Sequence, residues 1–118
     1  MKSRPTYEIK LYLGSINEDT KEAFSKDELI ELVSTFQDAR DIMIPICISD
    51  GLEFVSGSEY RERGWKISVI NYPKLDNDIE ILEEFMQDLA SVLISGFKQN
   101  IITIVSPHRT IMLERQHV

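Results

Sequence analysis

Hydrophobic and polar residues follow one another along this chain with two different periods, and each period predicts one kind of element. A strand buries one side when hydrophobic residues stand at every second position, and a helix does so when they recur every three or four positions. Glycine, proline and short polar runs separate such stretches here. The pattern predicts strands over residues 7–13, 42–48, 52–55, 65–72, 101–105 and 110–113, and helices over residues 26–39 and 78–97.

Both predicted helices begin with residues that favour a helix start. Ser25 and Glu28 have the spacing of a capping box, in which each side chain accepts a hydrogen bond from the other residue's backbone N–H. Phe24 and Leu29 have the spacing of the hydrophobic staple that often accompanies such a box. The second helix follows the polar run 76–78, which supplies N-caps, and acidic residues occupy its first turns, where the helix dipole favours negative charge.

Isoleucine stands at every second position of the predicted strand over residues 42–48. We expect this strand to be buried on both faces or nearly so. Pro45 has no backbone N–H to donate, so the strand should lie at a sheet edge or carry a bulge. Cys47, the one cysteine, is expected to be a small hydrophobic residue of the core. The run 49–51 (Ser-Asp-Gly) predicts a turn after it.

The order of these elements is β-α-β-β-α-β with an extra C-terminal strand. It predicts an α+β, ferredoxin-like fold in which an antiparallel sheet carries two helices on one face. We expect residues 1–118 to form a single domain of this kind. The other sheet face would be bare in a monomer and would carry Tyr12, Ile70, Tyr72 and Met43. Exposed apolar surface of this extent favours association, so we expect a homo-oligomer, a dimer or higher.

Charge and composition narrow the function classes. The 118 residues include 13 basic and 20 acidic side chains, and the formal net charge is −7. A charge of this sign argues against general nucleic-acid binding and against binding to anionic lipid. The single cysteine excludes an intramolecular disulfide. The sequence shows neither a signal peptide nor the roughly 20 apolar residues of a membrane span, so we expect a cytoplasmic protein.

Most sequence signatures of catalysis are absent. The five glycines match no nucleotide-binding loop motif. His108 and His117 are the only histidines, and with Cys47 they give no zinc-ligand spacing. We therefore expect no metal, no cofactor and no catalytic residue, and the prediction is that the chain is not an enzyme. The acidic residues between positions 78 and 88 are interpreted as the solvent-facing side of the second helix.

Basic residues gather in two segments that the pattern assigns to loops, residues 60–66 and 106–110. Loops on a rigid scaffold often carry function, and the guanidinium fork of arginine suits phosphate. An aromatic ring such as that of Tyr60 could stack on a base, whereas Trp65 also fits a core position. Surface charges that improve solubility are the alternative interpretation. The candidate ligand-binding residues are Tyr60, Arg61, Arg63, Lys66, His108 and Arg109.

Three short segments resemble an uncharacterised bacterial and phage domain family with the same element order. They are Leu-Tyr-Leu-Gly at residues 11–14, the pair Arg61-Glu62 before a strand, and Phe-Lys-Gln-Asn at residues 97–100. By topology the chain is also similar to PII-like signalling proteins, which are trimers that bind adenine nucleotides in clefts between subunits. Residues 57–60 take the position of the long loop of those proteins and are shorter here. In size and oligomeric habit the chain resembles phage-encoded sponges that sequester cyclic-nucleotide signals.

These observations lead to one interpretation and two alternatives. The chain is interpreted as a non-catalytic, oligomeric protein that captures a small anionic, nucleotide-type ligand between subunits, as a phage anti-defence sponge or a sensor. The first alternative is an acidic protein-interaction module that inhibits a basic partner. A small enzyme with a site between subunits is the second. A ligand site needs the loop arginines, whereas a docking face needs helix acids such as Glu83 and Glu84.

Overall fold

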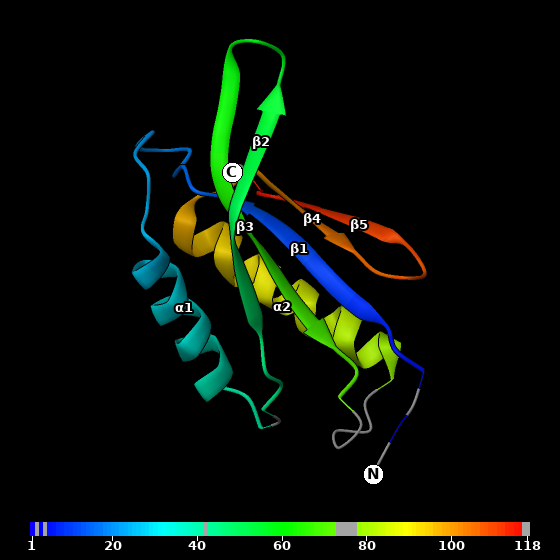
Figure 1. Ribbon diagram of the computed structural model, residues 1–118. Helices are drawn as coiled ribbons and strands as arrows, with labels where there is room; N and C mark the ends of the chain where they lie inside the picture. Colours follow the sequence, from blue (N-terminus) through cyan, green and yellow to red (C-terminus); the bar gives the residue numbers. More distant parts are fainter. Residues whose placement is uncertain (2, 4, 42, 73–77, 117–118) are drawn as a thin grey trace.

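The computed structural model arranges the chain in two layers, an antiparallel sheet and a pair of helices on one of its faces (Figure 1). It describes all residues except 2, 4, 42, 73–77 and 117–118. Predictions that fall on Ile42, Pro73, Asp76, Asn77 and His117 therefore lie outside the described residues. The strands are β1 (Glu8–Gly14), β2 (Cys47–Ser56), β3 (Tyr60–Ile70), β4 (Ile101–Val105) and β5 (Thr110–Glu114), and the helices are α1 (Lys26–Asp38) and α2 (Ile79–Phe97).

The strand order of the sheet is β2-β3-β1-β4-β5, and each of these neighbours pairs antiparallel. Strand β1 lies at the centre, where Leu11 is opposite Ile67 of β3 and Ile104 of β4. This order confirms the predicted α+β, ferredoxin-like arrangement with an added C-terminal strand. The edges of the sheet are β2 on one side and β5 on the other.

The core lies between the sheet and the helices. Alternate residues of β1, namely Ile9, Leu11 and Leu13, are fully buried, and their neighbours in β3 face the same side. Helix α2 buries Leu82, Met86, Leu89 and Leu93 against them. Full burial of such a side chain contributes roughly 1.5–3 kcal/mol, so this shared apolar layer accounts for most of the stability of the fold.

The predicted start of α1 is confirmed in detail. The Glu28 amide donates to Ser25 Oγ (3.1 Å), and the Ser25 amide donates to Glu28 Oε2 (2.7 Å). Helix α2 begins after Asp78, whose Oδ1 accepts a hydrogen bond from the Ile81 amide (3.0 Å). It ends at Phe97, and the capping residue Lys98 that follows has a left-handed backbone (φ 53°). Within the described residues, no helix is both long enough and apolar enough to cross a membrane.

Strand β2 differs from the prediction. Residues 43–46 are not a strand, since Pro45 cannot donate in a ladder, and β2 begins instead at Cys47. It continues through the predicted turn, and its register with β3 shifts between Ser49 and Leu52. Gly51 has a φ of 80°, so the turn residues are used to make a bulge within one long strand. Cys47 is exposed, and the prediction of a core position for it was wrong.

Strand β3 begins at Tyr60, well before the predicted start at Trp65. Arg61 and Arg63 pair with Val55 and Glu53 of β2, and the hairpin that they form projects beyond the helices (Figure 1). The prediction that the basic residues of segment 60–66 lie in a loop was therefore wrong. Trp65 is 8% exposed and belongs to the core.

Candidate functional site

A hollow lies on the sheet face that turns away from the helices, and we call it the sheet-face hollow. Adjacent residues of a strand point to opposite faces, so Tyr12 and Gly14 face outward between the buried Leu11 and Leu13. The hollow has a volume of about 330 Å³. Its lining residues come from β1, β2, β3, β4 and the segments beside them: Tyr12, Gly14, Glu18, Phe54, Tyr60, Glu62, Gln99, Asn100, Ile101 and Thr103.

Glu62 is the most unusual residue of this hollow, because its side chain is charged and only 9% exposed. One carboxylate oxygen accepts a hydrogen bond from the Tyr60 hydroxyl, and the other accepts one from the Ile16 amide (N···O 3.0 Å). Tyr60 and Glu62 are two residues apart on β3 and therefore share a face. A buried carboxylate with donors on both oxygens has a fixed position, as a binding or catalytic group requires.

The Glu62 carboxylate changes the pKa of the Tyr60 hydroxyl. Its hydrogen bond to Glu62 raises the pKa of Tyr60 to about 12, and burial and the negative charges of Glu62 and Glu18 add to the effect. The phenol therefore remains protonated at neutral pH and acts as a donor. Glu18 is paired with Lys21 (2.8 Å), whereas the two donors to Glu62 are neutral groups.

A pair of glycines makes room for these side chains. Gly14 of β1 and Gly64 of β3 lie opposite each other on the open face. A Cβ at Gly14 would overlap the Glu62 carboxylate, and a Cβ at Gly64 would overlap the Leu13 carbonyl oxygen and the Phe54 ring. The two glycines thus form a floor on which a carboxylate and an aromatic ring can rest.

Aromatic rings form the wall of the hollow. Tyr12 and Phe54 meet edge to face, with ring centroids 6.3 Å apart, and Tyr60 is about half exposed beside them. Such rings offer flat apolar surfaces and attract cations through their negative faces. None of the lining residues, all within the described part of the chain, is lysine or arginine. The hollow by itself suits a ligand with an aromatic ring and a positive charge better than one with a phosphate group.

The structure brings only some of the predicted site residues to this face. Tyr60 lines the hollow, and Lys66 lies beside it on the same face, opposite Tyr12 of β1. Arg61 and Arg63 alternate with Tyr60 and therefore point to the other face of the projecting hairpin, where both are exposed.

The predicted residues His108 and Arg109 lie in the turn between β4 and β5. Arg109 Nε and one terminal nitrogen donate to Glu83 Oε2 of α2 (3.1 and 2.9 Å), and Ser106 Oγ donates to Glu83 Oε1 (2.7 Å). The Ser106 hydrogen bond, together with the hydrogen bond and charge of Arg109 and the charge of His108, lowers the pKa of Glu83, although burial opposes them. Glu83 is only 4% exposed, so the prediction that it faces solvent was wrong.

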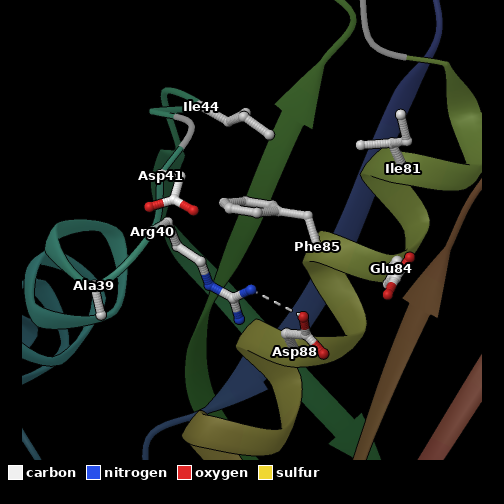
Figure 2. A pocket seen from close by; sticks show the side chains of 8 residues that line it. All are labelled: Ala39, Arg40, Asp41, Ile44, Ile81, Glu84, Phe85 and Asp88. Carbon is white, nitrogen blue, oxygen red and sulfur yellow. Dashed lines mark ion pairs between the residues drawn. The ribbon is translucent and has the colours of Figure 1, made fainter.

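A second hollow lies between the end of α1 and helix α2 (Figure 2). Figure 2 shows Phe85 pointing from α2 toward Ile44 and Arg40. The Arg40 guanidinium pairs with Asp88 of α2 (3.1 Å) and lies 4.4 Å from the centre of the Phe36 ring. These contacts join the two helices and serve packing. Among the described residues, no three histidine, cysteine, aspartate or glutamate side chains gather as metal ligands would.

Comparison with known proteins identifies the fold. No protein-family model matches the chain, and no curated protein matches it by sequence. A phage SAM lyase in complex with S-methyl-5'-thioadenosine has a similar structure, with a TM-score of 0.69, 13% sequence identity, and coverage of 98% of this chain and 94% of that chain. A phage SAM lyase in the apo state has a TM-score of 0.66 and 15% identity, with coverage of 95% and 91%.

This likeness corrects the prediction that the chain is not an enzyme. The fold that it shares over almost its whole length is one that a lyase uses. Most of the hollow was not predicted from the sequence, since Tyr60 is the only predicted site residue among the lining residues. A signal was present nevertheless, because the segments 11–14, 61–62 and 97–100 that resemble the uncharacterised family each contribute lining residues.

Proposed function

We propose that this chain is a SAM lyase that binds S-adenosylmethionine in the sheet-face hollow and releases S-methyl-5'-thioadenosine. The observation that carries the proposal is Glu62, a buried carboxylate held by Tyr60 and the Ile16 amide within an aromatic hollow. The likeness in fold to phage SAM lyases supports the choice of substrate.

The chemistry of the substrate fits the lining of the hollow. S-adenosylmethionine has an adenine ring, a sulfonium and an ammonium group, so it combines flat aromatic surface with positive charge. Tyr12, Phe54 and Tyr60 supply ring faces for the first, and Glu62 supplies a negative charge for the second. The volume of about 330 Å³ lies at the lower end of the range of roughly 300–1,000 Å³ for small-molecule sites.

The reaction breaks the bond between the sulfonium sulfur and the γ-carbon of the methionyl group. The electron pair of that bond goes to sulfur, which becomes the neutral thioether of S-methyl-5'-thioadenosine. The carbon can take its new bond from an oxygen of the substrate's own carboxylate, which closes a five-membered lactone. This step balances without water, a metal or a protein nucleophile, and orientation of the substrate is then the main contribution of the protein.

The two positive charges of the substrate determine which of its groups Glu62 binds. A carboxylate beside the sulfonium would stabilise the substrate more than the transition state, because the positive charge on sulfur disappears as the bond breaks. The α-ammonium group keeps its charge throughout. We therefore assign to Glu62 the binding of the α-ammonium, which turns the carboxylate of the substrate toward its own γ-carbon.

The carboxylate of the substrate needs a positive partner, and the hollow has none among its lining residues. Among the predicted site residues, Lys66 is a cation on this face, half-buried and opposite Tyr12. The exposed Ile101 and Met112 extend the same face, and a second copy of the chain would cover them. In this proposal the protein is a homo-oligomer, and the exposed Arg61 and Arg63 of a neighbouring hairpin complete the site.

In a cell, this reaction would remove the methyl donor on which methyltransferases depend. The proposed action is anti-defence in the cytoplasm of a bacterial host, and it works by destroying a metabolite. It thereby differs from the sponge that the sequence suggested, because one protein molecule can consume many ligands.

Incubation of the purified protein with S-adenosylmethionine, followed by mass spectrometry of the products, tests the proposal. We expect S-methyl-5'-thioadenosine to appear in proportion to enzyme and time, and Glu62→Gln to reduce its rate by at least about 100-fold. Glu53→Gln is the matched control, because Glu53 is an exposed acid on the neighbouring strand β2. Absence of the thioether with wild-type protein, or equal rates in wild type and Glu62→Gln, would reject the proposal.

A further inference from the structure

The loop between β1 and α1, residues 15–24, reaches the sheet-face hollow at two points: Glu18 lines it, and the Ile16 amide donates a hydrogen bond to Glu62. Hydrogen bonds within the loop order it. The Asn17 backbone amide donates to the Glu22 carbonyl (2.9 Å), and Ile16 and Ala23 form an isolated β-bridge. Groups outside the loop fix its place: the Ser15 amide donates to the Arg63 carbonyl (3.0 Å), the Glu18 amide donates to the Lys98 carbonyl (3.3 Å), and the Gln99 side chain donates to the Ile16 carbonyl.

Gln99 holds this loop from the end of α2. Lys98 takes a left-handed backbone, and the Gln99 amide donates back to the Ile94 carbonyl (3.1 Å), so the chain turns sharply out of the helix. The Gln99 side chain is 6% exposed. Its amide nitrogen donates to the Ile16 carbonyl (2.8 Å) and to the Phe97 carbonyl (3.2 Å).

Ile16 thus has both of its backbone polar groups engaged, the carbonyl with Gln99 and the amide with Glu62. The Ile16 amide shares a peptide plane with the Ser15 carbonyl, which accepts a hydrogen bond from the Phe24 amide (2.9 Å). The Gln99 hydrogen bond fixes the next peptide plane, so both planes that meet at the Ile16 Cα are held, and with them the direction of the amide. The Glu62 carboxylate depends on that direction, since its floor, Gly14, has no side chain to lock it in place. Its other donor, Tyr60, lies on the projecting hairpin and is about half exposed.

We infer that Gln99 is a positioning residue, which acts through the Ile16 backbone to fix the Glu62 carboxylate in the sheet-face hollow. The catalytic part of this inference rests on the proposed lyase function. A displacement of about 1 Å in a positioned group can reduce a rate by about 100-fold. Loss of the Gln99 amide is therefore expected to reduce kcat by about 10- to 100-fold, with a smaller rise in KM.

Gln99→Met is the test variant, because methionine has a similar length and no hydrogen-bond donor. Gln37→Met is the matched control: Gln37 of α1 also donates its side-chain amide to a backbone carbonyl, that of Ile44 (3.0 Å), but it lies in the helix layer. Thermal unfolding of both variants reports the general loss of stability. The rate of thioether release then reports the effect on the hollow alone.

Ionisation of Tyr60, followed by the ultraviolet absorbance of tyrosinate, is a readout that does not need activity. The hydrogen bond to Glu62 is the largest cause that raises the pKa of Tyr60 to about 12, and the negative charge of Glu18 also contributes. In Gln99→Met we expect the pKa of Tyr60 to fall toward the ordinary value of 10.0, and in Gln37→Met we expect it to stay. The titration of a protein that also carries Tyr60→Phe, subtracted from the titration of the same protein with Tyr60 intact, isolates this residue from the other tyrosines.

The outcomes separate the two ideas. A folded Gln99→Met with unchanged kcat and unchanged Tyr60 titration would overturn the inference, as would equal effects in Gln37→Met. If wild-type protein releases no thioether, the proposed function fails, and the Tyr60 titration still decides whether Gln99 positions Glu62. Should Gln99→Met fail to fold, Gln99→Asn retains the amide on a shorter side chain, and the same shift in titration is expected.

Discussion

Glu62 extends from β3 over the Cα of Gly14 in β1, in space that any larger residue at position 14 would occupy. The carboxylate is therefore held close to the backbone of the neighbouring strand. The absence of a side chain in β1 is as necessary to this arrangement as the hydrogen bonds from Tyr60 and Ile16.

Gly14→Ala is expected to push the Glu62 carboxylate out of its place and to abolish most of the proposed lyase activity. Overpacking of this kind typically costs about 1–3 kcal/mol of stability, so the variant should still fold. Gly96→Ala in α2 is the control, because its Cβ would meet only the end of the flexible Leu32 side chain. Product release and urea unfolding measure the two effects, and an active Gly14→Ala would contradict the arrangement.

Tyr60→Phe is expected to lower the rate of thioether release, because Glu62 loses the donor to one of its oxygens. It should also remove the tyrosine with a pKa of about 12 from an alkaline titration. Tyr72→Phe serves as the control, because Tyr72 lies just after the end of the same strand, β3. If the high-pKa component persisted in Tyr60→Phe, the hydrogen bond to Glu62 would be assigned to the wrong residue.

Arg109→Ala is expected to destabilise the fold, in contrast to what its predicted loop position suggested. Truncation leaves the buried Glu83 with Ser106 as its remaining side-chain donor. The Arg109 side chain is 61% exposed, so solvent screens the pair, and we expect a loss of about 1–2 kcal/mol rather than the larger cost of a fully buried pair. Arg61→Ala, on the exposed hairpin, should stay within about 0.5 kcal/mol of wild type in urea unfolding.

The same pair predicts how stability depends on pH. The pKa of Glu83 is lower in the folded chain than its ordinary value of 4.5, so its contribution is present above pH 4.5 and is lost as the pH falls below that value. The difference in stability between wild type and Arg109→Ala should therefore shrink on acidification. Unfolding curves at several acidic pH values measure it, and a difference that grew as the pH fell would contradict the assignment.

Ser25→Ala is expected to cost about 1 kcal/mol, because it removes the acceptor for the Glu28 amide at the start of α1. Ser34→Ala, at an exposed position within the same helix, is the control for the loss of a hydroxyl. Urea unfolding compares the two, and equal stabilities would show that the capping box contributes nothing.

Light scattering at micromolar concentration tests the proposed homo-oligomer, for which we expect a mass of at least two chains. Met112→Asp puts a charge on the open sheet face, where Met112 is 60% exposed, and should reduce the mass. Ile30→Asp, at an exposed position of α1 in the helix layer, should not. A mass of one chain for wild type across this range would reject the assembly.

Local patterns predicted the elements that depend on local contacts. Helix α1 begins where Ser25 and Glu28 indicated, and β4 has the predicted bounds. The strand predicted over residues 52–55 lies within β2, but the extension of the hairpin through Tyr60 was missed, because residues 55–61 are exposed and show no apolar alternation. Charged residues such as Arg61 and Arg63 then resembled a loop.

The site could not be predicted from spacing along the chain. Glu62 receives its backbone donor from Ile16, which is 46 residues away, and its floor from Gly14. Only the pairing of β1 with β3 brings these residues together. A charged residue between two arginines gives no sign of burial by itself, because burial depends on the loop that covers it.

The link between Glu83 and the β4–β5 turn also restricts how the edge of the sheet can assemble. Strand β5 is short, and side chains such as Ile111 and Leu113 would tolerate several alignments beside β4. A slip of one residue would exchange its two faces, and a slip of two would carry Arg109 away from the buried carboxylate. Either error leaves a charge without its partner inside the protein, so the ion pair selects a single alignment of the last hairpin during folding.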